Sequence, residues 1–120
     1  MSIDPVLGDR LAARLRAGEE LSAAERRTLG RAALAELRAL APGRSTEVRI
    51  PYVGAVQVIA GPTHTRGTPP NTIEMSLDTW LALAVGIDTW AEALARGAID
   101  ASGTRADISR HLPLYTKATS

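Results

Sequence analysis

Cysteine and phenylalanine are both absent from the 120 residues of the sequence. Without cysteine, the chain can form no disulfide, carry no catalytic thiolate and hold no metal through sulfur. Without phenylalanine, its core must be built mainly from Leu, Ile, Val and Ala around two tryptophans and two tyrosines. Such a core can pack closely or leave a hollow, and composition alone does not decide between the two.

A strong charge of either sign is lacking as well. The chain has 14 Lys and Arg residues against 13 Asp and Glu residues, which gives a formal net charge of +1. Nucleic-acid binding needs a concentrated basic surface, so we expect no nucleic-acid partner.

Long apolar runs are missing too. The N-terminus has no apolar stretch of the signal-peptide type, and no segment approaches the ~20 apolar residues that span a bilayer. We therefore expect a cytoplasmic protein without integral membrane association. With 45% hydrophobic residues, the chain is long enough for one core and too short for two, so residues 1–120 are expected to form a single domain.

Two helices are predicted in the first third of the chain. Asp4 and Pro5 are typical of a helix start, which predicts an N-terminal helical extension within residues 1–20. Ser22 and Glu25 have the spacing of a capping box and open a second, longer helix. The residues of this second helix that are expected to face the core recur at helical spacing: Leu29, Ala33, Leu37 and Leu40.

Two strands are predicted next, in EVRIPYVGAVQVIAG. Val48, Ile50 and Tyr52 alternate with other residues, as in a strand that buries one face. Pro51 has no N–H donor, so it places this strand at a sheet edge or at a bulge. Residues 55–60 are apolar on both faces apart from one glutamine, which predicts a strand deeper in the sheet.

Residues 71–107 predict a strand, two short helices and a closing strand, around which the rest of the chain is arranged. The run TIEMS alternates like a half-buried strand, and Asp78 is the expected N-cap of the helix that ends at Gly86. Thr89 begins the second helix, Gly97 ends it, and AIDASG forms the closing strand. Helices this short need an apolar surface to hold them, and we expect that surface to be the sheet.

The loop GPTHTRGTPPN can form neither a helix nor a paired strand. The side chains of this loop that could bind a ligand are His64 and Arg66. Arginine offers a planar fork of donors, and histidine offers a donor that charges near neutral pH. The two side chains could bind an anion or a carboxylate. Alternatively, Arg66 pairs with Asp107 or with a backbone carbonyl and only fixes the loop.

Several stretches of the chain together resemble one known family. They are APGRSTEVRIP, AVQV, HTRGTPPN, WLALAVG, TWAEAL, ASGTRAD and HLPL, spread over residues 31–114. In these stretches the chain resembles the bacterial branch of the sterol carrier protein family. The resemblance implies an α+β fold in which a mixed, mainly antiparallel sheet of four to five strands is covered by helices, with an apolar cavity between the layers. Relatives hold fatty acyl chains, sterols or other lipids there without chemical change, which implies no catalytic residue, no cofactor and no metal.

The resemblance and the apolar pattern together predict a ligand site. An acyl tail would lie between the helix pair and the sheet, and a carboxylate head would meet basic side chains at the mouth. The predicted tail contacts are Val58, Met75, Trp80, Leu81, Leu83, Trp90 and Leu94, and the predicted head contacts are His64, Arg66 and Arg105. The same apolar residues are also what a filled core needs, so a purely structural role stays open for each of them.

Two other functions stay open. In a protein interaction or homodimerisation module with a filled core, HTRGTPPN and ASGTRAD would form a polar surface that binds a partner. An enzyme is the least favoured, because catalysis by His64 would need a nucleophile or an orienting carboxylate. Ser102, Asp107 and His111 are candidates for those roles by residue type only, and two histidines so far apart have no metal-ligand spacing.

The C-terminal segment is predicted to pack back on the core. Residues 104–114 are expected to make a helical turn capped by Thr104 or Asp107, with Ile108 and Leu112 facing inward. Residues 115–120 are expected to be frayed.

Overall fold

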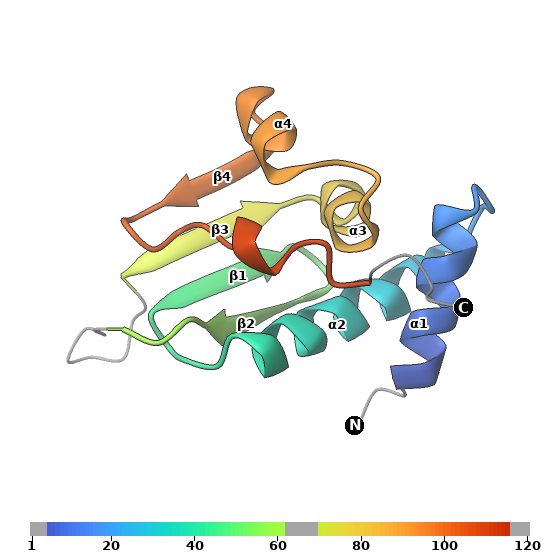
Figure 1. Cartoon of the computed structure of the whole chain (residues 1–120), viewed down its shortest axis with the longest axis horizontal. Coiled ribbons are helices and arrows are strands. Elements are labelled where there is room, and N and C mark those ends of the chain that lie inside the picture. The colour runs from blue at the N-terminus through green and yellow to red at the C-terminus, as the bar shows by residue number, and fades with distance from the viewer. Residues whose placement is uncertain (1–4, 62–69, 116–120) are drawn as a thin grey trace.

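The computed structural model describes residues 5–61 and 70–115 of the chain. Asp4, His64 and Arg66, for which roles were predicted, lie outside the described residues, as do residues 116–120. In chain order the elements are α1 (Pro5–Arg16), α2 (Ala23–Leu40), β1 (Thr46–Ile50), β2 (Gly54–Val58), β3 (Asn71–Met75), α3 (Leu77–Val85), α4 (Trp90–Ala95), β4 (Ile99–Ser102) and the 3-10 helix η1 (Ser109–His111). Figure 1 shows the strands side by side in one sheet, with α1 packed beyond it against α2 and α3.

The sheet has the strand order β2-β1-β3-β4. Strands β1 and β3 are parallel, and both outer pairs are antiparallel. The predicted α+β fold with a mixed, mainly antiparallel sheet is therefore confirmed, with four strands. Alternation along the strands places Val48 and Ile73 on a covered face, whereas Arg49 and Glu74 lie exposed on the open face.

Three predictions about the first hairpin are wrong. Strand β1 ends at Ile50, so Pro51 and Tyr52 belong to the turn, where Tyr52 is fully exposed with a φ of 66°. Because Pro51 lies beyond the ladder, it does not force β1 to an edge, and β1 pairs on both sides. The edge strand is β2 instead, and its apolar residues are covered by α2 rather than by a second neighbouring strand.

Two of the predicted helix starts are confirmed. At α2, the Ser22 hydroxyl accepts from the Glu25 N–H at 3.1 Å, and the Glu25 carboxylate accepts from the Ser22 N–H at 2.9 Å. At α4, the Thr89 hydroxyl accepts from the Glu92 N–H at 3.2 Å. These bonds satisfy N–H groups that the first turn of a helix leaves without a partner.

The predicted N-cap of α3 is wrong. The Ser76 hydroxyl accepts from the Thr79 N–H at 3.2 Å, so the helix begins two residues earlier than predicted. Asp78 lies in the first turn, where its carboxylate pairs with Arg26 of α2. The predicted end of α3 is confirmed, because Gly86 adopts the left-handed conformation with a φ of 83°.

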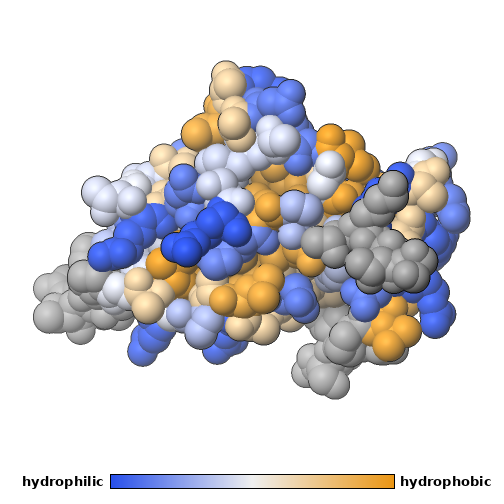
Figure 2. Space-filling view, in the orientation of Figure 1, coloured by the Kyte–Doolittle hydropathy of each residue, from blue (hydrophilic) through white to orange (hydrophobic). Residues whose placement is uncertain are grey.

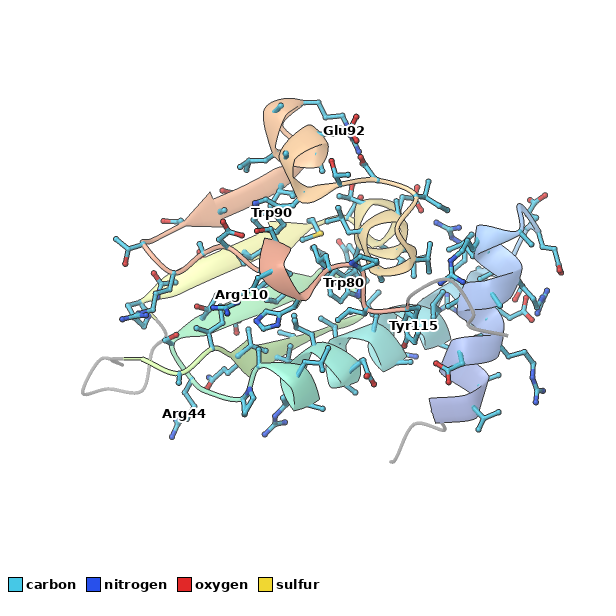
Figure 3. All side chains as sticks on the ribbon, in the orientation of Figure 1. Arg44, Trp80, Trp90, Glu92, Arg110 and Tyr115 are labelled. Atoms are coloured by element: carbon cyan, nitrogen blue, oxygen red, sulfur yellow. The ribbon has the colours of Figure 1, made fainter. Side chains whose placement is uncertain are left out.

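Helices α2 and α3 approach each other closely at Gly30. A Cβ built on Gly30 would lie 2.7 Å from Cδ1 of Leu77 and 3.3 Å from Cγ1 of Val53, so a methyl group there would require these side chains to shift. Trp80 is fully buried beside it, and its Nε1–H donates to the Gly30 carbonyl at 3.0 Å. Figure 3 shows Trp80 between α3 and α2. A buried indole with a satisfied donor is well suited to a core position.

The predicted core stripe of α2 is confirmed for three of its four residues: Leu29, Ala33 and Leu37. The fourth, Leu40, is 51% exposed at the end of the helix. Leu94 of α4 is likewise 45% exposed, so the prediction of a core position for it is wrong. Helix α4 is only six residues long and buries Trp90 and Ala93 instead.

The C-terminal segment covers the sheet as predicted. Ile108 is fully buried, Leu112 packs against the core, and the Asp107 carboxylate accepts from the Ser109 N–H at 2.8 Å where the turn of η1 begins. In Figure 1 this segment, drawn in red, crosses the face of the sheet on the same side as α3.

Tyr115 is not frayed, which corrects the prediction for that residue. It is buried, and its N–H donates to the Ala84 carbonyl at 3.0 Å, while its own carbonyl accepts from Arg16 of α1. Burial raises the pKa of the Tyr115 phenol, and the carboxylates of Glu36 and Asp9 raise it further. The last described residue thus fastens α1 to the rest of the molecule.

Candidate functional site

An open cleft of about 640 Å³ lies where β1 and β3 end. We call it the apolar cleft. It is lined by Arg27, Pro51, Tyr52, Val53, Glu74, Met75, Ser76, Leu77, Asp78, Gly97, Ala98 and Asp100. Its volume is in the range of roughly 300–1,000 Å³ that is usual for small-molecule sites.

The apolar cleft is shaped by the turn between β1 and β2. The Val53 N–H donates to the Ile50 carbonyl at 3.0 Å, which closes the turn and leaves Tyr52 at its tip. A left-handed conformation is unusual for a bulky residue, so Tyr52 is held there at a cost in conformational energy. Val53 and Leu77 meet over Gly30 and give the cleft its apolar wall, to which Met75 adds a thioether.

The rim of the apolar cleft carries more negative than positive charge. Glu74 of β3 and Asp100 of β4 are directly opposite each other in the register and lie on the open face. Asp78, the third carboxylate of the lining, is paired with Arg26, and Arg27 is the cation among the lining residues. Like charges placed opposite one another on two strands are unfavourable, so this rim suits a neutral ligand better than a carboxylate.

A second cleft, of about 370 Å³, lies where β1 and β3 begin. We call it the basic cleft. It is lined by Ala41, Pro42, Ile59, Ala60, Thr104, Arg105, Asp107, Arg110 and His111. Five-residue strands span about 16 Å, so the basic cleft and the apolar cleft are separated by the length of the sheet.

The floor of the basic cleft is fixed by a buried polar network. Asn71 donates through Nδ2 to the Ser45 carbonyl at 2.8 Å and accepts through Oδ1 from the Arg105 N–H at 3.0 Å. The Thr46 hydroxyl donates to the Arg105 carbonyl at 3.0 Å. Gly103, with a φ of 109°, has no room for a Cβ, which would lie 2.2 Å from Asn71 Oδ1. The backbone of Arg105 is therefore held on both sides by buried side chains.

Ile59 forms a rigid wall of the same cleft. Its φ is 65°, a conformation that β-branched residues rarely adopt. Hydrogen bonds on both sides hold it there: its N–H donates to the Ala41 carbonyl at 2.8 Å, and its carbonyl accepts from the Ser45 N–H and hydroxyl. Gly43 passes so close to Ile59 that a Cβ on Gly43 would lie 2.1 Å from the Ile59 carbonyl carbon.

The predicted ligand-binding residues are not brought together. Met75 lines the apolar cleft, Arg105 lines the basic cleft, and Trp90 lines a third cleft of about 310 Å³ between α4 and the segment around η1. Four of the predicted residues are fully buried and line none of these three clefts: Val58, Trp80, Leu81 and Leu83. Leu94 lines none of them either.

Comparison with known protein families fits this architecture. A family model described as "Bacterial SCP ortholog" matches residues 22–114. The chain belongs to this family. The match confirms the resemblance to bacterial sterol carrier proteins and extends it from Arg31 back to Ser22, the N-cap of α2. A search of curated proteins found no match.

Both clefts lie entirely within the matched residues. Within residues 5–61 and 70–115, no helix combines the length and the apolar character needed to cross a membrane. The same part of the chain holds no group of three or more His, Cys, Asp and Glu side chains placed to bind a metal ion.

Sequence reasoning missed several residues that shape the clefts. Asn71 and Thr46 read as ordinary strand ends, although Asn71 closes the TPPN motif and Thr46 lies in the GRSTE motif. The ASGTRAD motif supplies Gly103 and Arg105, so three separate motifs meet in one buried network. Tyr52 and Val53 could have been found from the turn itself, since they lie between Pro51 and Gly54.

Proposed function

We propose that this protein binds a hydrophobic small molecule, such as a fatty acyl lipid or a sterol-like compound, and carries it without chemical change. The observation that supports this most is the apolar cleft, whose wall is formed by Val53, Met75 and Leu77. Membership of a family of bacterial sterol carrier protein orthologs supports the same class of ligand. No catalytic group is needed for this role.

The charge of the rim limits which head group the ligand can carry. A free fatty acid would bring its carboxylate toward Glu74 and Asp100, which repel it. An alcohol, an ester or an amide head would avoid that repulsion and could donate a hydrogen bond to either carboxylate where it carries an O–H or N–H. We therefore expect a neutral head group on the apolar ligand.

The experiment uses two matched valines of the same hairpin. Val53 and Val56 are both partly buried and both pack on the core, but only Val53 lines the apolar cleft. We expect Val53→Ser to weaken binding of a neutral fluorescent acyl ester about 5- to 30-fold, because one apolar contact is worth about 1–2 kcal/mol. Val56→Ser is expected to leave affinity within about twofold. Equal losses in both variants, or no binding by the wild-type chain, would contradict the proposal.

A protein interaction module is the second candidate. It is favoured by Tyr52, a fully exposed aromatic residue at the tip of a turn, and by the complete burial of Trp80 in the core. Exposed aromatic residues are enriched at binding interfaces. If Tyr52→Ser abolished capture of a partner or a dimer seen by sedimentation while acyl-ester binding was absent throughout, this candidate would replace the carrier role.

A further inference from the structure

The basic cleft contains two arginines without a described partner. Four other arginines each pair with a carboxylate: Arg14, Arg26, Arg49 and Arg96. Among residues 5–61 and 70–115, no hydrogen bond or ion pair engages the side chain of Arg105 or Arg110, although both line the same cleft. Figure 2 shows strongly hydrophilic residues gathered over η1 and the segment that leads to it.

The charge of the basic cleft is positive. The lining holds Arg105, Arg110 and His111 and one carboxylate, Asp107, and one oxygen of that carboxylate already accepts from the Ser109 N–H. Arg44 does not add to the set, because it bonds Gln57 and points away from Arg110 in Figure 3.

The backbone of Arg105 is fixed before any ligand arrives. Its backbone is bonded to Asn71 and Thr46, and its guanidinium lies against Gly61, where a Cβ would come within 2.8 Å of Nε. A fixed backbone limits where the guanidinium can lie, which lowers the conformational freedom lost on binding. The polar end of the cleft is therefore built on a backbone that is already in place.

We propose that the basic cleft is a binding site for a phosphate group carried on a small apolar body. Two guanidinium forks and an imidazole offer donors to more than two oxygens, which matches a phosphate better than a carboxylate. Ala41, Pro42, Ile59 and Ala60 supply an apolar wall for the attached carbon chain. This site does not depend on the proposed function of the apolar cleft, from which it is separated by the sheet.

The test is calorimetric titration of the full chain with hexyl phosphate at low salt. We expect the double variant Arg105→Gln/Arg110→Gln to bind at least tenfold more weakly than the wild type. Arg31→Gln is the matched control, because Arg31 is an exposed arginine of α2 that lines neither cleft. Arg105→Lys, which keeps the charge but loses the fork, should fall between the wild type and the double variant. Melting temperatures close to that of the wild type would show that each variant is folded.

Three further ligands identify the source of the phosphate. Tighter binding of hexyl phosphate than of inorganic phosphate would support a phosphorylated small molecule, and equal binding would support free phosphate. Binding confined to vesicles that contain phosphatidic acid would support a lipid head group. Hexanoate that binds as tightly as hexyl phosphate, an equal loss in Arg31→Gln, or no binding of any phosphate by the wild type would overturn the proposal. Val53→Ser is expected to leave hexyl phosphate binding unchanged. The result for the basic cleft is therefore independent of the result for the apolar cleft.

Discussion

The two ends of the sheet are built from the same pair of parallel strands and yet differ in kind. Where β1 and β3 begin, a network of Thr46, Asn71 and the Arg105 backbone fixes a cleft whose two arginine side chains have no partner among residues 5–61 and 70–115. Where they end, Val53 and Leu77 close over Gly30 and border a cleft with an acidic rim. Position at one end of a parallel pair thus determines which motifs meet and which ligand chemistry they suit.

The two ends also share one feature. Each cleft is bordered by a bulky residue with positive φ, Ile59 at the basic end and Tyr52 at the apolar end. The strained backbone conformation of Ile59 is held by hydrogen bonds to its N–H and its carbonyl. Tyr52, by contrast, lies fully exposed on a turn. The basic end is therefore the more rigid of the two.

If the two clefts are separate, the core between them must be filled. Trp80→Ala tests this and has the largest expected effect. Loss of a fully buried indole should lower the free energy of unfolding by about 3–5 kcal/mol, measured by urea denaturation. Leu94→Ala is the control, and at an exposed position it should cost less than about 1 kcal/mol. If the two variants were equally stable, Trp80 would not be a core residue.

The rigidity of the basic end can be broken at Asn71. Asn71→Ala removes one buried and one part-buried hydrogen bond; the Ser45 carbonyl keeps only the Asn71 N–H, and the Arg105 N–H loses its side-chain acceptor, so we expect a loss of roughly 2–4 kcal/mol in unfolding free energy. Hexyl phosphate affinity should fall as well, whereas acyl-ester affinity at the other end should not. Thr72→Ala, one residue along on the exposed face, should change stability by less than about 0.5 kcal/mol. An Asn71→Ala protein as stable as Thr72→Ala would show that the network does not hold this end.

Tyr115 gives a pH-dependent effect that neither cleft should share. Because burial raises the pKa of its phenol in the folded state above the ordinary 10.0, its contribution to stability is complete below pH 10 and is lost as the pH rises above that value. We expect up to about 1.4 kcal/mol of stability to be lost per pH unit in that window. Urea denaturation at several pH values measures the slope, and Tyr115→Phe should reduce it. A slope unchanged by this substitution would place its origin elsewhere.

The smallest expected effect is a gain in stability at the apolar end. Tyr52→Gly should raise the unfolding free energy by about 1 kcal/mol, because glycine adopts positive φ without steric cost. The same change should weaken acyl-ester binding several-fold, since Tyr52 lines the cleft. Tyr52→Asn, which tolerates this conformation, separates relief of strain from loss of the aromatic contact. A variant that gains stability and keeps full affinity would remove Tyr52 from the binding site.

Local signals predicted most of the fold. The capping box at Ser22, the cap at Thr89 and the left-handed Gly86 each depend on neighbouring residues, so the sequence pattern was sufficient to place them. Ser76 and Asp78 are both good N-caps two residues apart, and only the structure shows that Ser76 is used and that Asp78 pairs with Arg26.

Long-range packing decided what the sequence could not. The apolar pattern of residues 55–60 was typical of a central strand, but α2 covers β2 and the same pattern serves an edge strand. For the sites, Met75 and Arg105 each line a cleft, and their contact with a ligand stays a prediction. They lie at opposite ends because β3 and β4 pair antiparallel: Met75 ends β3, whereas Arg105 follows the end of β4, beside the start of β3.

The most direct test of the two-site account is a nuclear magnetic resonance titration of the ¹⁵N-labelled chain with 1-octanol and, separately, with hexyl phosphate. We predict that octanol shifts the amide signals of Tyr52, Val53 and Leu77, and that hexyl phosphate shifts those of Arg105, Arg110 and His111. Octanol shifts centred on Trp80 and Leu83, or both ligands shifting one common set of signals, would contradict the account.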